Sequence, residues 1–179
     1  VDLGRPEEYA LLREILAPLA MPVYVVPGNH DERGAMRRAF SDHAYLPQAG
    51  EFLHYVLEDY PVRLIGLDTV VAGEPGGELC EARLGWLDAQ LRRAPERETV
   101  IFMHHPPFLT GLANMDWQNC HNGEALGALP ERHRQVTRLL CGHVHRPIHL
   151  AWHGVTASIA PSPSHSCVFD LNEGASHDF

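Results

Sequence analysis

The sequence lacks paired cysteines, long apolar runs and any basic stretch. Its four cysteines form no Cys-x-x-Cys pair, which argues against a zinc ribbon or a thioredoxin-like redox site and favours a reduced, cytoplasmic setting. No apolar run approaches the roughly 20 residues that a membrane-spanning helix needs. The N-terminus shows no basic-then-apolar signal pattern. We therefore expect a cytoplasmic protein with no membrane partner.

Positive charge is also scarce, since the formal net charge is −9 at pH 7. This balance argues against binding of a nucleic-acid polymer, because phosphate-backbone binding requires a basic patch. An anionic substrate would need a local counter-charge, which a bound divalent metal could supply. The length of 179 residues and the 45% share of hydrophobic residues indicate a single folded domain over residues 1–179.

The pattern of apolar residues predicts an α/β domain. Helical spacing predicts amphipathic helices over residues 6–19 and 84–93, with shorter helices over 33–40 and 124–129. The runs at 52–57 and 62–67 are expected to pair as a hairpin, and the last three predicted strands are expected to form a second set. Short apolar runs between turn-forming residues predict these strands: 23–26, 52–57, 62–67, 99–103, 136–141, 148–152, 155–159 and 167–171.

Three loops rich in histidine or asparagine each follow a predicted strand directly. They are Gly-Asn-His-Asp at residues 28–31, His-His-Pro-Pro at 104–107 and Gly-His-Val-His at 142–145. In an open α/β sheet, ligands bind beyond the carboxyl ends of the strands. The three loops can therefore converge at one edge of the sheet and share a pocket.

The side chains of these loops suit a transition-metal site. Imidazole nitrogens and an amide oxygen, if joined by carboxylates, make a mixed site suited to zinc, iron, manganese or cobalt. Two such metals, roughly 3.5–4 Å apart, would clamp a phosphate and lower the pKa of a bridging water. This hydrolytic chemistry needs no nucleophilic side chain, in keeping with the absence of a Gly-x-Ser-x-Gly motif from the sequence.

Each motif also has a simpler interpretation when it is taken alone. His143 and His145 could be strand-end histidines, and Asn29 could be a turn residue, since Gly-Asn suits tight turns. His104 and His105 are adjacent and therefore point in different directions. Of these two, we expect His104 to bind metal and His105 to be a structural or substrate-side residue. The occurrence of all three motifs in one chain favours metal binding.

In this order, the three motifs resemble those of the calcineurin-like metallophosphoesterases. Further stretches, at residues 4–9, 103–107 and 114–123, are similar to the branch that contains bacterial class III cyclic-nucleotide phosphodiesterases and glycerophosphodiesterases. The resemblance implies a four-layer α/β sandwich in which two mixed β-sheets are flanked by helices. It covers nearly the whole chain.

The resemblance also implies a dinuclear metal centre. It makes Asn29, His104 and His143 ligands of one metal, and it makes His145 a ligand of the other. The two ions would be manganese, iron, zinc or cobalt. The implied activity is hydrolysis of cyclic nucleotides or small glycerophosphodiesters by a metal-bound hydroxide.

The remaining expectations concern catalysis and the substrate. His30 would face the phosphate and stabilise charge or protonate the leaving alkoxide, with Asp31 fixing the orientation of its ring. The loop at 108–123 has no periodicity and is expected to be functional or mobile, although a packed surface loop explains it as well. The expected substrate-binding residues are His30, His105, Asn114, Met115 and Asn122.

The chain departs from the family pattern because it contains neither an Asp-x-His motif nor a Gly-Asp motif. These motifs supply carboxylates, including the one that bridges both metals, so we expect an N-terminally truncated domain that lacks its first strand or strands. Such a chain would be weakly active or inactive. Oligomerisation could cover a sheet edge that is left unpaired. The alternatives are a phosphomonoesterase or phosphoprotein phosphatase of the same superfamily, or an inactive module with a residual metal site.

Overall fold

The computed structural model describes residues 1–167 and 171. Most of the strand predicted at 167–171 lies outside these residues. The described chain forms helices and strands in this order: α1 (Pro6–Leu16), α2 (Arg33–Ala39), β1 (Tyr55–Leu57), β2 (Arg63–Leu67), β3 (Gly77–Glu78), α3 (Glu81–Arg93), β4 (Thr99–Met103), α4 (Ala113–Asp116), β5 (Cys120–His121), α5 (Gly123–Arg132), β6 (Val136–Cys141), β7 (Ile148–Trp152) and β8 (Val155–Ile159).

Six of the strands form one mixed sheet with the order β1-β2-β4-β6-β8-β7. The four central strands, β2, β4, β6 and β8, run parallel, while β1 and β7 pair antiparallel at the two edges. Because the central strands share one direction, their carboxyl ends lie at the same edge of the sheet. The predicted hairpin of 52–57 with 62–67 corresponds to the β1–β2 pair.

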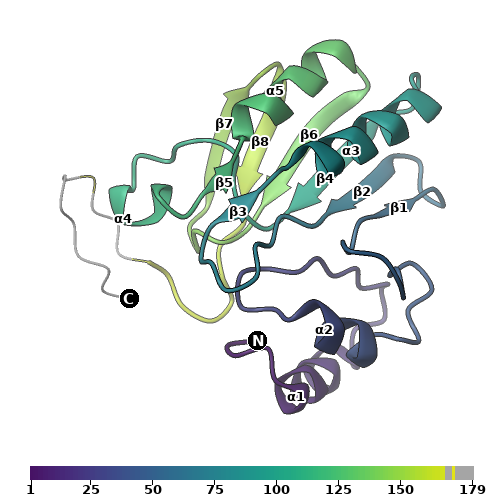
Figure 1. Ribbon diagram of the computed structural model, residues 1–179, viewed down its shortest axis with the longest axis vertical. Coiled ribbons are helices and arrows are strands. Elements are labelled where there is room, and N and C mark those ends of the chain that lie inside the picture. Colours follow the sequence, from purple (N-terminus) through teal and green to yellow (C-terminus); the bar gives the residue numbers. More distant parts are fainter. Residues whose placement is uncertain (168–170, 172–179) are drawn as a thin grey trace.

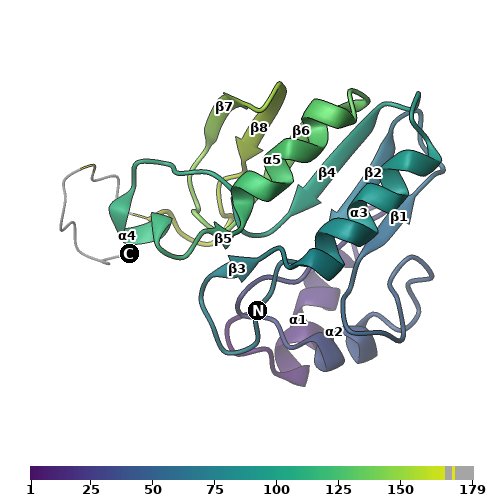
Figure 2. The ribbon, with the colours of Figure 1, turned by 45° about the horizontal axis from the view of Figure 1, so that its top comes forward.

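Each face of the sheet contributes to a different hydrophobic core, as the alternation of side chains along a strand requires. Ile65 and Ile101 face α3 and α5 and belong to the larger core. Their neighbours Leu64 and Phe102 face the opposite way and pack in a second core with residues of α1 and α2. The sheet therefore lies between α3 and α5 on one side and α1 and α2 on the other (Figures 1 and 2).

Helix α2 is fixed at its start by Glu32, whose carboxylate accepts hydrogen bonds from the backbone N–H groups of Gly34 and Ala35 at 2.7 and 2.6 Å. A carboxylate in this position satisfies N–H groups that have no partner within the helix and interacts favourably with the helix dipole. Since α2 begins two residues after Asp31, this cap also fixes the end of the Gly-Asn-His-Asp loop.

The fold class is confirmed as mixed α/β with flanking helices, but several predicted strands are placed differently. Residues 148–152 and 155–159 do not begin a second facing sheet, because β8 pairs with β6 and extends the first sheet. The other sheet within the described residues contains only β3 and β5, and neither of these short strands was predicted.

The prediction of a strand at 23–26 was wrong, since these residues belong to neither sheet. Two tyrosine hydroxyls bind the backbone of Val25 instead. Tyr45 accepts a hydrogen bond from the Val25 N–H at 3.0 Å, and Tyr55 donates one to the Val25 carbonyl at 2.8 Å. The segment was predicted to be a buried strand, whereas its residues are half-buried and tyrosine side chains rather than a neighbouring strand satisfy the Val25 backbone.

Two glycine substitutions test this packing. A Cβ atom at Gly66 in β2 would lie 2.6 Å from the buried Tyr55 ring, whereas a Cβ at Gly85 in α3 would meet open space. We expect Gly66→Ala to lower the free energy of unfolding by about 1–3 kcal/mol. The control Gly85→Ala should raise it by roughly 0.5–1 kcal/mol, because alanine favours a helix interior. Chemical denaturation measures both, and equal effects would contradict the packing described.

Candidate metal centre

The candidate site lies at the carboxyl ends of the central strands. The strand β4 leads directly to His104 and His105, and β6 leads through Gly142 to His143. His165 lies in the segment that follows β8. The loop at 28–31 reaches the same edge. The prediction that the three motif loops converge is therefore confirmed.

Three potential ligand atoms meet at the centre of this cluster. The Nε2 atom of His104 lies 2.9 Å from Oδ1 of Asn29 and 3.3 Å from Nδ1 of His143. A Cβ atom at Gly28 would lie 2.8 Å from the His104 ring, so glycine at this position leaves room for the imidazole. The side chains of Asn29, His104 and His143 lie together as predicted.

These atoms fit a metal ion chemically. The Nε2 atom of His143 is buried near the backbone of Gln118 without a well-formed hydrogen bond. The three converging atoms are an amide oxygen and two imidazole nitrogens, which are the donors that divalent transition metals accept. A cation at their meeting point would replace the hydrogen bonds that now join these atoms at 2.9 and 3.3 Å.

Burial keeps these imidazoles neutral. It lowers the pKa of His104 well below its ordinary value, with further lowering by the neighbouring histidines His105 and His143. Burial, followed by the proximity of His145, lowers the pKa of His143 to about 4. At neutral pH the nitrogen lone pairs are therefore available to a metal.

His105 belongs to the same group by distance, because the ring nitrogens of His104, His105 and His143 lie within 4.8 Å of one another. Its side chain is nevertheless fully buried. Its Nε2 lies 3.2 Å from the Pro75 carbonyl, which can only accept, so Nε2 donates. Nδ1 then accepts from the Thr69 hydroxyl at 2.8 Å. Both ring nitrogens are thus occupied, and Asn29 rather than His105 completes the set of three ligand atoms.

Of the two roles expected for His105, the structure favours the structural one, because the ring is buried and does not line the cavity. The adjacent His104 and His105 rings are perpendicular, with an interplanar angle of 90°. Only His104 turns towards the cavity in front of the site, and His105 turns into the protein. We predicted that the rings of the adjacent His104 and His105 would point in different directions. The sequence did not show which residues His105 would contact.

His145 lies apart from the three converging atoms and forms a second histidine pair. Its Nδ1 is 3.0 Å from Nε2 of His165. The backbone of both His143 and His145 is left-handed, with φ angles of 70° and 57°. Such angles are uncommon for residues other than glycine and occur often at functional sites. His165 lies in a loop rich in serine and proline and was not among the predicted site residues.

A cavity of about 430 Å³ lies in front of the histidines, which is within the usual size range for small-molecule sites. Within the described chain, no residue that lines it is arginine or lysine. Bound metal would therefore have to supply the positive charge for an anionic substrate. The lining residues are Asp2, Asn29, His30, His104, Met115, Gln118, His143, His145, His165 and Cys167.

His30 lines this cavity as predicted, but Asp31 does not hold its ring. The Nδ1 atom of His30 donates to the backbone carbonyl of Asp2 at 2.7 Å. The Asp31 carboxylate accepts from the Gly28 N–H and from the Tyr9 hydroxyl, both at 2.8 Å. The tight turn between Gly28 and Asp31 directs Asp31 away from the ring. This carboxylate fixes the shape of the loop.

The residues predicted from the loop at 108–123 separate into two groups. Met115 lines the cavity, and Gln118, which the sequence did not suggest, lies beside it. Asn114 is buried in α4, where its carbonyl accepts from the Trp117 indole N–H at 3.0 Å. Asn122 precedes α5 and lines a different hollow, together with residues such as Phe108. Of the three predicted residues, only Met115 contacts the histidine cavity.

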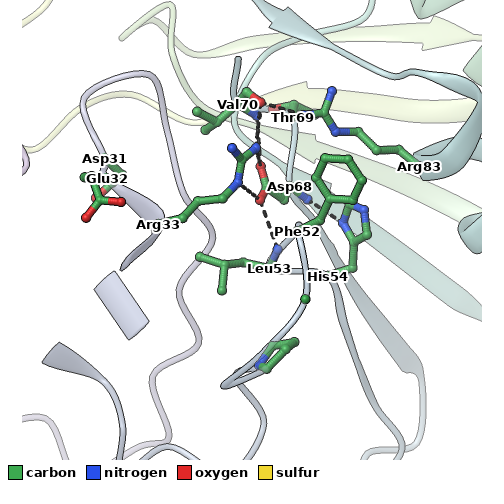
Figure 3. Close-up of polar contacts among 12 residues, drawn as sticks. Asp31, Glu32, Arg33, Phe52, Leu53, His54, Asp68, Thr69, Val70 and Arg83 are labelled. Carbon is green, nitrogen blue, oxygen red and sulfur yellow. Dashed lines mark hydrogen bonds and ion pairs between the residues drawn. The ribbon is translucent and has the colours of Figure 1, made fainter. Parts of the chain in front are cut away.

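A buried ion pair lies behind the site, and sequence analysis missed it (Figure 3). The Arg33 guanidinium binds the fully buried carboxylate of Asp68 through Nε at 2.6 Å and Nη2 at 2.9 Å. Asp68 also accepts from the backbone N–H groups of Leu53 and Val70 at 3.0 and 2.9 Å. Arg33 holds the pKa of Asp68 below its usual range against the opposing effect of burial. The only local signal was an aspartate directly after a buried strand.

Comparison with known proteins shows the family of the chain. The calcineurin-like phosphoesterase family matches residues 1–147. The chain belongs to this family. The resemblance of its motifs to the phosphodiesterase branch is confirmed by curated bacterial relatives of the chain.

Two of these relatives are named as phosphodiesterases. A probable glycerophosphodiester phosphodiesterase of Arcobacter nitrofigilis is 40% identical, with 99% of this chain and 65% of the relative covered. The 3',5'-cyclic adenosine monophosphate phosphodiesterase of Escherichia coli K12 is 35% identical, with 86% and 54% covered. This calcineurin-like chain thus spans less than two thirds of the length of these relatives.

A solved structure supports the fold. A dimetal phosphatase from Danio rerio superimposes with a TM-score of 0.65 at 17% identity, covering 89% of this chain and 68% of the other. No helix in the described part of this calcineurin-like chain is both long and apolar enough to cross a membrane. Its four cysteines, all within the described residues, are free thiols.

The buried histidine next to Asp68 generates a prediction about pH. His54 accepts a hydrogen bond from the Asp68 N–H at 3.0 Å, and burial lowers its pKa from 6.5 to about 4. Between these values the unfolded chain binds a proton that the folded chain does not. Because His54 stays neutral in the folded chain, the free energy of unfolding should fall by about 3 kcal/mol as the pH is lowered from 6.5 to 4.

The variant His54→Asn keeps an acceptor for the Asp68 N–H and should lose less stability across this pH range than the parent. Urea denaturation at several pH values measures the difference. The control His149→Asn changes an exposed histidine on β7 and should lose as much as the parent. An unchanged pH dependence in His54→Asn would contradict the assignment.

Proposed function

We propose that residues 1–179 form part of a metal-dependent phosphodiesterase that hydrolyses small phosphodiesters, either cyclic nucleotides or glycerophosphodiesters. The observation that carries this proposal is the convergence of Asn29 Oδ1, His104 Nε2 and His143 Nδ1 beside a cavity of small-molecule size. The names of the bacterial relatives support the substrate class. The free thiols support a cytoplasmic location.

Asn29, His104 and His143 would hold one transition metal, and His145 would contribute to a second. We propose manganese, iron, zinc or cobalt, because neutral imidazole and amide ligands accept all four. When bound, the metals supply positive charge to the phosphate and lower the pKa of the attacking water. The remaining ligands for the second metal would be carboxylates of the Asp-x-His and Gly-Asp motifs, which the sequence of residues 1–179 does not contain.

His30 is placed to move a proton. Its Nδ1–H is occupied by the Asp2 carbonyl, so Nε2 is the atom that can exchange a proton with the cavity. Its side chain is 57% exposed, so a phosphodiester in the cavity can approach it. We assign His30 to protonation of the leaving alkoxide, a step that contributes typically 10²–10⁴-fold to rate.

Two variants separate metal binding from proton transfer. Asn29→Ala should weaken cobalt binding to residues 1–179 at least tenfold in calorimetric titration, because it removes one of three ligands. His30→Ala should bind cobalt as the parent does. In the gene product that contains residues 1–179, loaded with manganese, His30→Ala should lower kcat for bis(p-nitrophenyl) phosphate by about 10²–10⁴-fold.

The control for both measurements is His149→Ala, whose side chain lies on β7 and contacts Ser158 rather than the cavity. It should match the parent in metal affinity and in turnover. If Asn29→Ala binds cobalt as tightly as the parent, the assigned metal site is wrong. If His30→Ala hydrolyses the diester at the parental rate, His30 has no part in proton transfer.

A further inference from the structure

We propose that Asp68 and Thr69, directly after β2, are positioning residues that set the distance between the metal ligands Asn29 and His104. This inference rests on the proposed metal site. Asp68 holds the segment that contains Asn29, and Thr69 holds the segment that contains His104. Neither residue lines the cavity, and both are fully buried.

Asp68 acts on the Asn29 loop through Arg33, the first residue of α2 and four residues beyond Asn29. Arg33 donates hydrogen bonds from Nε and Nη2 to the two carboxylate oxygens of Asp68. Its Nη2 also donates to the Val70 carbonyl at 2.6 Å. Such two-point contacts fix orientation as well as distance. The beginning of α2, and with it the end of the Asn29 loop, is therefore tied to the end of β2.

The position of Asp68 is itself determined from several sides. Its carboxylate accepts from two backbone N–H groups, and its own N–H donates to His54. Beside it, the Phe52 ring lies against the guanidinium groups of Arg33, at 5.6 Å, and Arg83, at 4.4 Å. Arg83 donates to the same Val70 carbonyl at 2.6 Å. The charged pair is thus surrounded by contacts from several segments, as Figure 3 shows.

Thr69 acts on His104 through the adjacent His105. Its hydroxyl donates to Nδ1 of His105 at 2.8 Å and accepts from the His105 N–H at 3.5 Å. These contacts hold both the ring and the backbone of the residue next to the ligand. A Cβ atom at Gly77 would lie 2.4 Å from the His105 ring, so the ring is enclosed on its other side as well.

The two sets of contacts start from the consecutive residues Asp68 and Thr69, which we call the bracket. They hold two segments whose ligands, Asn29 and His104, are 75 residues apart in sequence. The contact between Asn29 and His104, at 2.9 Å, joins the two segments that the bracket holds. A ligand set that is held in place before binding loses less freedom when the metal binds. Removing the contacts of either Asp68 or Thr69 should therefore weaken metal binding without removing a ligand.

Thr69→Val tests the bracket with little change in volume, because valine replaces the hydroxyl by a methyl group. We expect it to weaken cobalt binding to residues 1–179 about tenfold, whereas Thr69→Ser, which restores the hydroxyl, should bind within twofold of the parent. Asp68→Asn should also weaken binding about tenfold. The matched control is Asp88→Asn, which removes another carboxylate paired with an arginine and a histidine, Arg92 and His133, that do not line the cavity.

Thermal unfolding of each variant separates positioning from general stability. Asp88→Asn should lower Tm and leave cobalt affinity unchanged, while Thr69→Val should lower affinity at temperatures where it is fully folded. If folded Thr69→Val and Asp68→Asn both bind cobalt within twofold of the parent, the bracket has no positioning role. That result would leave the proposed metal site intact.

If the parent chain binds no cobalt, the proposed function is contradicted instead. NMR of the histidine rings in the metal-free chain then tests whether the bracket positions the ligands. The parent should show His105 protonated at Nε2. Thr69→Val should shift the ring resonances of His104 and His143, and Asp88→Asn should not. Unshifted His104 and His143 resonances in Thr69→Val would overturn the inference.

Discussion

The parallel alignment of β2, β4, β6 and β8 is the constraint on which the rest of the site depends. It places the segments that begin at Asp68, His104 and Gly142, and the segment containing His165, at one edge of the sheet. Residues far apart in sequence can then share one cavity. The edge strands β1 and β7 run in the opposite direction and contribute no residue to it.

Burial disfavours charge on every buried group of the site, but it prevails only at the histidines. Burial keeps His104 and His143 neutral and leaves their lone pairs to bind a cation. Behind them, Asp68 stays charged although it is buried, because Arg33 and two backbone N–H groups compensate the loss of water. A neutral ligand set is thus supported by an ionised frame, and this division of roles suits a site that gains its charge from metal.

The sequence allowed prediction of most strands of the sheet and of the convergence of the three loops, because strand periodicity and strand ends are local signals. The choice of Asn29, His104 and His143 as one ligand set came from the resemblance to the family. It did not predict that Val25 would bind tyrosine side chains rather than a strand. It also could not show which way His105 and Asp31 turn, since both depend on distant partners. The ion pair of Arg33 with Asp68 joins residues 35 positions apart and has no local pattern.

The central claim is that Asn29, His104 and His143 bind one metal, and a crystal structure of the protein grown with zinc tests it most directly. Anomalous scattering should place an ion about 2.0–2.2 Å from Asn29 Oδ1, His104 Nε2 and His143 Nδ1. An ion bound elsewhere, with the contact of Asn29 and His104 at 2.9 Å undisturbed, would contradict the account.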